Sequence, residues 1–96
     1  MSFSADLLDA AKQAHGIRSD YALAQRLGVT RSAVSNYRRG VAFPDLTTTY
    51  ALAKLAGSSP AEAVLGVNLD RAAGGKDAEV WAALRAEFRA AAQAAG

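Results

Sequence analysis

Apolar residues recur at intervals of three and four along most of this chain, the spacing that places side chains on one face of an α-helix. Leu7, Leu8 and Ala11 show the pattern first, in a stretch over residues 4–15 that ends at Gly16. Later stretches repeat it, with short breaks at glycine and proline between them. The pattern predicts an all-α fold.

Residues 20–39, DYALAQRLGVTRSAVSNYRR, read as two short helices joined by one tight turn. Ser19 can cap the first helix and Thr30 the second, because both side chains can accept a bond from a backbone N–H. Gly28 lies between the two helices, where the chain has to adopt a left-handed conformation that only glycine adopts cheaply. Residues 20–39 are therefore a predicted helix-turn-helix.

The second helix of this motif, residues 31–39, is apolar on one side only. Val34 and Tyr37 fall on the inward side, and the polar and cationic residues fall on the side turned away from the core. That outward face requires a partner. The residues predicted to lie on it are Arg31, Ser32, Ser35, Asn36, Arg38 and Arg39.

The loop after the motif separates it from a predicted fourth helix. Pro44 excludes a helix that continues before it, and Asp45 can cap the next one. Residues 46–56 form that helix, with Leu46 and Leu52 among its expected core residues.

A fifth helix begins with a strong signal. Ser59 can cap it, Pro60 suits its first position, and Glu62 completes a capping box. The expected core residues of this fifth helix are Val64 and Leu65. With it, residues 1–66 make a complete five-helix domain.

The chain beyond this domain divides into a hinge over residues 67–76 and a long helix over residues 77–96. The Gly74-Gly75 pair predicts a flexible break, and the Ala, Glu and Arg content of the last segment favours a helix. One face of that helix carries an apolar stripe, which can bury either against the fifth helix or against the same stripe of a second chain. The stripe consists of Val80, Trp81, Leu84 and Phe88.

The distribution of charge indicates a nucleic-acid partner more clearly than its total does. The 96 residues carry a formal net charge of only +2 at pH 7. Residues 17–40, however, contain five arginines against the single acid Asp20, whereas no other part of the chain carries a positive excess. Positive charge concentrated in this way favours the phosphates of a duplex.

Composition argues against catalysis, a metal or a cofactor. The chain has no cysteine and one histidine, His15, at a predicted helix end where its charge suits the helix dipole. Neither a nucleophile–base pair nor a metal-ligand cluster can be assembled from these residues. We therefore expect no enzyme activity and no metal or cofactor. No apolar run is long enough to cross a bilayer and no signal peptide is evident, so we expect a cytoplasmic protein.

The helix-turn-helix resembles that of the Cro and repressor proteins of lambdoid phages and of the wider family of bacterial regulators that share it. Ala24 lies where the two helices cross, and Gly28 lies four residues later at the turn. The resemblance extends from about Phe3 to Gly66 and implies a lambda-repressor-like DNA-binding domain of five helices, here followed by an additional C-terminal helix. The family's buried positions are occupied by Leu23, Leu27, Val29, Val34 and Tyr37.

The same resemblance assigns DNA contacts to residues of the motif. Arg31 matches the two major-groove acceptors of guanine, and Asn36 has the geometry for adenine. Where the family often places a glutamine against a phosphate, this chain has Asp20, an acid that would repel DNA. The base-reading positions are Arg31, Ser32, Ser35 and Asn36, and the phosphate-contacting positions are Arg38, Arg39, Thr30 and Arg18.

The function that the resemblance implies is that of a sequence-specific transcriptional regulator, a small phage or mobile-element repressor that acts at the bacterial nucleoid. It would bind a palindromic operator in double-stranded DNA as a homodimer, through the C-terminal stripe or through residues 41–50, which family members often use. The alternative is an antitoxin-like protein, which would neutralise a protein partner through its C-terminal helix and bind DNA to control its own expression.

Overall fold

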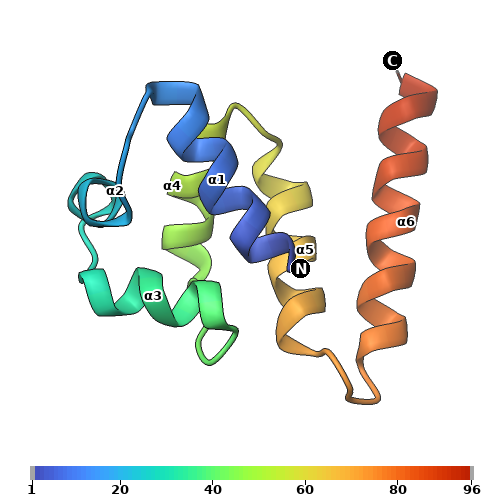
Figure 1. Cartoon of the computed structure of the whole chain (residues 1–96). Coiled ribbons are helices and arrows are strands. Elements are labelled where there is room, and N and C mark those ends of the chain that lie inside the picture. The colour runs from blue at the N-terminus through green and yellow to red at the C-terminus, as the bar shows by residue number, and fades with distance from the viewer. Residues whose placement is uncertain (1, 96) are drawn as a thin grey trace.

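The computed structural model describes residues 2–95, and every regular element in that range is an α-helix (Figure 1). Met1 and Gly96, the outermost residues of the segments expected from the sequence, lie outside the described residues. The predicted all-α class with an additional C-terminal helix is confirmed. The helices are α1 (Phe3–His15), α2 (Asp20–Leu27), α3 (Arg31–Arg39), α4 (Leu46–Ala56), α5 (Pro60–Arg71) and α6 (Ala78–Ala95).

The ends of the helices follow from local hydrogen bonding. A side-chain oxygen caps each of α1 to α5 by accepting a bond from a backbone N–H three residues later. Gly28 ends α2 at a φ of 73°, the left-handed conformation expected at this corner. The predicted caps Ser19, Thr30, Asp45 and Ser59 are all confirmed.

The core lies where α1 and α4 cross, between the helix-turn-helix on one side and α5 on the other (Figure 1). Leu8, Leu23, Val34 and Leu52 come from α1, α2, α3 and α4 respectively, and all four are fully buried. Burying one large side chain from each of these helices removes apolar surface from water and fixes the helices to one another. The motif is thereby held on a rigid support.

Helix α5 is longer than the sequence indicated, and the hinge is correspondingly shorter. The sequence predicted a hinge over residues 67–76, whereas α5 continues to Arg71 and the non-helical connection spans residues 72–77. The core residues of α5 are also different, since Ala63, Gly66 and Val67 are buried while Val64 and Leu65 are only half-buried. Small residues face the core here because α5 packs closely against α1 and α4.

Asp70 explains why the last turn of α5 is ordered. Its carboxylate accepts bonds from the backbone N–H groups of Phe3, at 3.2 Å, and Ser4, at 2.7 Å, and from the Ser4 hydroxyl at 2.6 Å. A negative charge at the N-terminus of α1 is also favoured by the helix dipole. The end of α5 is thus tied to the beginning of α1, more than sixty residues away in the sequence.

Phe3 forms a second link between the two ends of the chain. A Cβ at Gly66 would lie 2.5 Å from the Phe3 ring, so only glycine at this position of α5 lets the ring pack against the backbone. The Arg85 guanidinium of α6 lies over the same ring, 4.9 Å from its centre. Phe3 is therefore held between α5 and α6.

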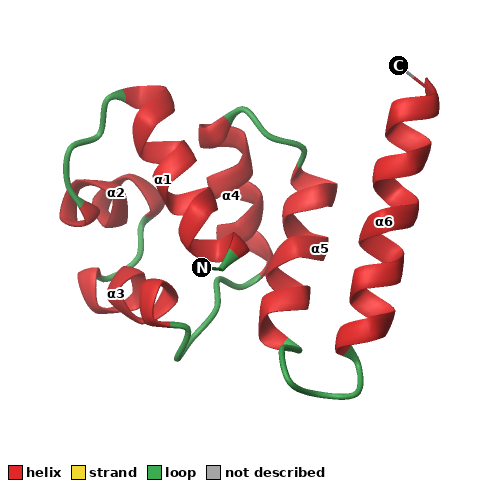
Figure 2. Cartoon of the chain, turned by 45° about the vertical axis from the view of Figure 1, so that its right-hand side comes forward, coloured by secondary structure: helices red, strands yellow, loops and turns green. Residues whose placement is uncertain are grey.

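Helix α6 runs beside α5 and packs against it (Figure 2). Ala78, Trp81, Arg85 and Phe88 are half-buried and recur at helical spacing, which identifies the face turned towards α5. Val80 and Leu84, in contrast, are 56% and 42% exposed. The predicted apolar stripe is therefore divided, with one part against its own chain and the other part open.

The other exposed apolar cluster lies beside α3. Val41, Leu46 and Tyr50 are 60%, 69% and 54% exposed. The sequence predicted Leu46 in the core, which is wrong: at this end of α4, Pro44 is fully buried and Leu46 faces solvent. Val41, Leu46 and Tyr50 are called the α4 patch below.

The division of the stripe on α6 leads to a stability prediction. Replacing Trp81 and Phe88 by Ala should lower the free energy of unfolding by about 1–3 kcal/mol, because both side chains lose contact with α5. Replacing Val80 and Leu84 by Ala should change it by no more than about 0.5 kcal/mol, because these side chains are already in water. Urea denaturation measures both, and equal losses for the two pairs would show that the open part of the stripe is also buried.

Candidate nucleic-acid interface

The outward face of α3 is a continuous polar surface. Its exposed residues, at positions 31, 32, 35 and 39, are separated by intervals of one, three and four residues. Such spacing places them on one side of the helix, opposite Val34 and Tyr37. Val34 is fully buried and Tyr37 is 8% exposed, and these two side chains anchor the helix to the core. The exposed residues are Arg31, Ser32, Ser35 and Arg39.

The turn before α3 presents the start of this helix to solvent. Val29 is half-buried in the corner between α2 and α3, and its N–H donates to the Ala24 carbonyl at 3.0 Å. The Thr30 hydroxyl oxygen accepts a bond from the Ala33 N–H at 3.0 Å. Thr30 is exposed, so its O–H remains available to donate to a phosphate while its oxygen caps the helix.

Asn36 lies at one edge of the exposed face of α3. It is half-buried, and its side-chain amide forms no hydrogen bond within residues 2–95. Four of the predicted contact residues, Arg31, Ser32, Ser35 and Arg39, therefore share one open face, with Asn36 beside them.

Arg38 lies at the opposite edge, and its environment differs from the one predicted. The sequence placed it on the outward side, free to contact a phosphate, but its guanidinium is turned towards α1 and α2. Nε donates to Asp20 Oδ2 at 2.7 Å, and Nη2 donates to Asp20 Oδ1 at 3.0 Å and to Asp9 Oδ1 at 2.8 Å. Arg38 is therefore the one arginine of the motif that is engaged by acids within the described part of the chain.

Asp20 is the centre of this ion-pair cluster. Its carboxylate also accepts a bond from Lys12 Nζ at 3.1 Å. The Arg38 guanidinium, more than Lys12, holds the pKa of Asp20 below its ordinary value, and Asp20 in turn raises the pKa of Arg38. The cluster of Asp9, Lys12, Asp20 and Arg38 joins α1, α2 and α3, and its four charges cancel.

The remaining arginines of residues 17–40 carry the positive charge of this region. Arg18 lies in the connection before α2, and Arg39 ends α3 beside the following loop. The four arginines of residues 17–40 other than Arg38 are exposed, and none of the four forms an ion pair with any residue from 2 to 95. They are Arg18, Arg26, Arg31 and Arg39.

Tyr21 is an exposed residue of α2 that sequence reasoning did not single out. It is 54% exposed in the first turn of α2, and its hydroxyl accepts a bond from Gln25 Nε2 at 3.2 Å. A tyrosine in an amphipathic pattern usually indicates the core, so its position relative to Leu23 and Ala24, which are buried, is the only signal that would have placed it outside.

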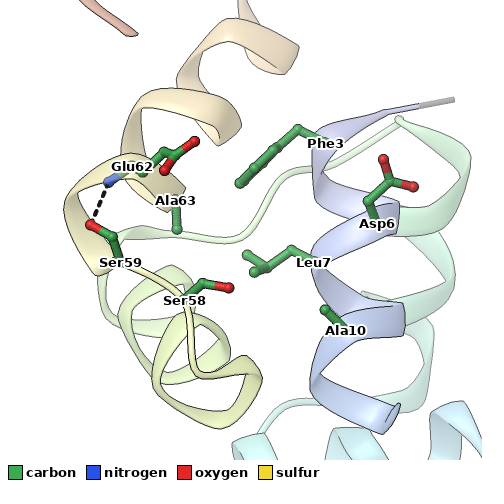
Figure 3. Close-up of a pocket in the computed structure, with 8 residues that line it drawn as sticks. All are labelled: Phe3, Asp6, Leu7, Ala10, Ser58, Ser59, Glu62 and Ala63. Atoms are coloured by element: carbon green, nitrogen blue, oxygen red, sulfur yellow. Dashed lines mark hydrogen bonds between the residues drawn. The ribbon is translucent and has the colours of Figure 1, made fainter. Parts of the chain in front are cut away.

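A small cavity of about 220 Å³ lies away from this surface, between α1 and the start of α5 (Figure 3). Phe3 and Leu7 point into it from α1, and Ala63 faces them from α5. No residue of α2 or α3 lines the cavity. It is therefore no part of the polar surface of α3.

The part of the chain that the structure describes also lacks a metal-ligand cluster and a membrane-spanning helix. Residues 2–95 contain no group of three or more His, Cys, Asp or Glu side chains placed to hold a metal ion. No helix in the same range is both long and apolar enough to cross a membrane.

Comparison with known proteins identifies the same part of the chain. A family model described as helix-turn-helix matches residues 10–63, which is more than half of the sequence. The matched range includes all of α2 and α3 and ends within the first turns of α5, so α6 lies outside it. No curated protein and no solved structure matches the chain.

The lowered pKa of Asp20 predicts how the cluster responds to acid. A carboxylate whose pKa is lower in the folded than in the unfolded state stabilises the fold above about pH 4, and the contribution is lost as the pH falls through the folded-state value. The difference in melting temperature between the wild type and Asp20→Asn should be largest near neutral pH and should shrink below about pH 4. Asp77→Asn, at an exposed acid outside every ion pair, is the control. A difference that does not change with pH would contradict the prediction.

Proposed function

This chain belongs to the Cro- and C1-type helix-turn-helix family of DNA-binding transcription regulators, and from that premise we propose that it is a sequence-specific repressor of the phage or mobile-element kind. The observation that carries the proposal is the open polar face of α3, held outward by Val34 and Tyr37. A helix of this width enters the major groove of a duplex. A DNA partner places the protein at the bacterial nucleoid.

We assign sequence reading to the first part of the exposed face of α3. Arg31 lies in the first turn of the helix and can donate two parallel bonds to one guanine, and Asn36 can form the matching pair with adenine. Hydroxyl groups discriminate between bases less strongly, because they both donate and accept. The hydroxyl-bearing residues in this role are Ser32 and Ser35.

We assign backbone contacts to residues at the two ends of this surface. Arg39 lies at the C-terminal end of α3, and Arg18 and Thr30 precede α2 and α3. Contacts with phosphates supply affinity and orientation without reading sequence.

A dimer is part of this proposal, because one recognition helix reads only a few base pairs. A two-fold pair would place two such helices about 34 Å apart, one turn of DNA, on a palindromic operator. The α4 patch is well placed for the contact, since Val41 follows α3 directly and Leu46 and Tyr50 lie one turn apart on α4.

The arrangement of the helices favours the α4 patch over α6 as the dimer contact. Helices α1, α4 and α5 lie between α3 and α6 (Figures 1 and 2). The chain measures 36 × 32 × 21 Å along its principal axes, so a pair joined through α6 would hold the two recognition helices at its outer ends. A pair joined beside α3 brings them within the spacing of adjacent half-sites.

A second candidate function follows from the open part of α6. Val80 and Leu84 are exposed large apolar side chains on a helix that has no fully buried residue. An antitoxin-like protein would use this surface to bind a protein partner, while α3 binds DNA for autoregulation. Copurification of a small partner that protects Val80 and Leu84 from labelling would favour this function, whereas operator binding by the protein alone favours the repressor.

The assignment of Arg31 to base reading makes a direct prediction. Arg31→Ala should weaken binding to the preferred duplex by about fivefold or more, because a bidentate pair discriminates by about 1–3 kcal/mol, and should leave binding to random duplex nearly unchanged. Fluorescence anisotropy with both duplexes measures the two affinities. Arg26→Ala, which removes the same charge from an exposed arginine of α2, is the matched control. If both affinities fall by the same factor, Arg31 does not read a base.

Arg39 should behave in the opposite way. Arg39→Ala should weaken binding to all sequences and reduce the slope of log affinity against log salt by about one unit. An unchanged slope would assign this side chain to solvent.

The dimer contact can be tested without unfolding the domain. Leu46→Ser with Tyr50→Ser should leave the melting temperature nearly unchanged, because both side chains are exposed, but should give a monomer in sedimentation and weaker binding to a palindrome. Val80→Ser with Leu84→Ser on α6 is the control and should leave the dimer intact. The reverse result would place the dimer contact on α6.

A further inference from the structure

We propose that Arg38 is a positioning residue of the DNA-binding surface and contacts no phosphate: its ion pairs with Asp20 and Asp9 set the orientation of α3 relative to α1 and α2. The inference rests on the proposed function, because the orientation of α3 matters only if this helix reads DNA. The proposal also explains Asp20, which stands where the family often has a glutamine in contact with a phosphate. In this chain Asp20 would orient α3 through Arg38.

The geometry links three helices at one point. Arg38 lies in the last turn of α3, Asp20 in the first turn of α2, and Asp9 in the middle of α1. Two parallel bonds of 2.7 and 3.0 Å join the Arg38 guanidinium to both oxygens of Asp20. Such a bidentate pair restricts direction as well as distance, which a single bond does not. Asp9 holds the same guanidinium from the side of α1 at 2.8 Å.

The ion pairs of Arg38 matter for α3 because the apolar contact of this helix with the core is small. It has nine residues, and only Val34 and Tyr37 are buried. The capped turn at Thr30 holds its beginning, and no apolar residue of α3 follows Tyr37, because the next side chains packed on the core, Ala42 and Pro44, lie in the loop beyond the helix. The pairs of Arg38 add a directional restraint between this end of α3 and helices α1 and α2. That restraint matters because a base-reading side chain has to be placed within about 0.5 Å of its productive position.

The charges around Arg38 argue against a phosphate contact. Its Nε and Nη2 donors are both used within the chain, and its side chain is 28% exposed. Lys12 and Arg38 balance Asp9 and Asp20, so the cluster offers a phosphate no net positive charge. A contact that neutralises no phosphate releases no counterions and adds nothing to the salt dependence of binding.

A substitution at Asp20 distinguishes an effect of net charge from an effect on the orientation of α3, because the two predict opposite changes in DNA affinity. If only net charge matters, Asp20→Asn should bind DNA more tightly, because it removes a negative charge from a protein that approaches a polyanion. If Asp20 orients α3 through Arg38, the same substitution should bind operator DNA more weakly. The exposed Asp77, outside the cluster, calibrates the effect of charge alone when it is changed to Asn.

The experiment measures affinity for the preferred duplex over a range of salt concentrations, at a temperature where melting curves show each variant to be folded. Asp20→Asn and Arg38→Ala should each weaken binding by about fivefold to tenfold, the loss expected when a bidentate charge pair is broken, with the salt slope of the wild type. Asp77→Asn should bind as the wild type does or slightly more tightly. The double variant should bind no more weakly than Arg38→Ala alone, because both changes break the same pair.

Asp9→Asn keeps the measurement informative if the other variants unfold. Asp9 is 59% exposed and leaves the Asp20 pair in place, so a smaller loss of affinity with an unchanged slope is expected. Tighter binding by Asp20→Asn, or a salt slope reduced by about one unit in Arg38→Ala, would overturn the inference while leaving the proposed function standing. A wild type that shows no preference for any duplex would instead contradict the proposed function itself.

Discussion

The structure depends on how a short, polar helix is held against a core to which it contributes only two buried side chains. Helix α3 has nine residues and buries only Val34 and Tyr37, so its apolar contact with the core is small and polar contacts share in setting its orientation. The surrounding elements supply what is missing: the glycine corner at Gly28, the cap at Thr30, and the ion pairs that Arg38 forms with α1 and α2. Because only two side chains of α3 are buried in the core, nearly all of its outer face is available to a partner.

The same arrangement explains which parts of the molecule the sequence predicted well. The starts of α2 to α5 and the corner at Gly28 were predicted correctly because capping and left-handed glycine depend on residues within three or four positions. The last turn of α5 was missed because the groups that Asp70 binds, at Phe3 and Ser4, are at the other end of the chain. For the candidate site, the exposed face of α3 follows from helical periodicity alone, whereas the engagement of Arg38 depends on how α1 and α2 approach it.

Helix α6 shows a different limit of sequence reasoning. The stripe of Val80, Trp81, Leu84 and Phe88 indicates how much of the helix is apolar, but not which partner covers each side. Packing against α5 places Arg85 over Phe3, and Glu62 accepts a bond from Arg89 at 2.6 Å, and these contacts rotate the helix so that Val80 and Leu84 remain open. Within residues 2–95, the α4 patch beside α3 and the open part of α6 are therefore separate exposed apolar surfaces. We propose the first for a dimer on DNA and the second for a protein partner.

Selection of bound duplexes from a random-sequence pool tests the central claim most directly, because it asks whether the outer face of α3 reads bases at all. We expect a two-fold symmetric motif whose half-sites lie about one helical turn apart. Within each half-site we expect a guanine whose N7 is required, so that its 7-deaza analogue binds more weakly. Recovery of no common motif, or of a motif that tolerates 7-deazaguanine at every position, would contradict it.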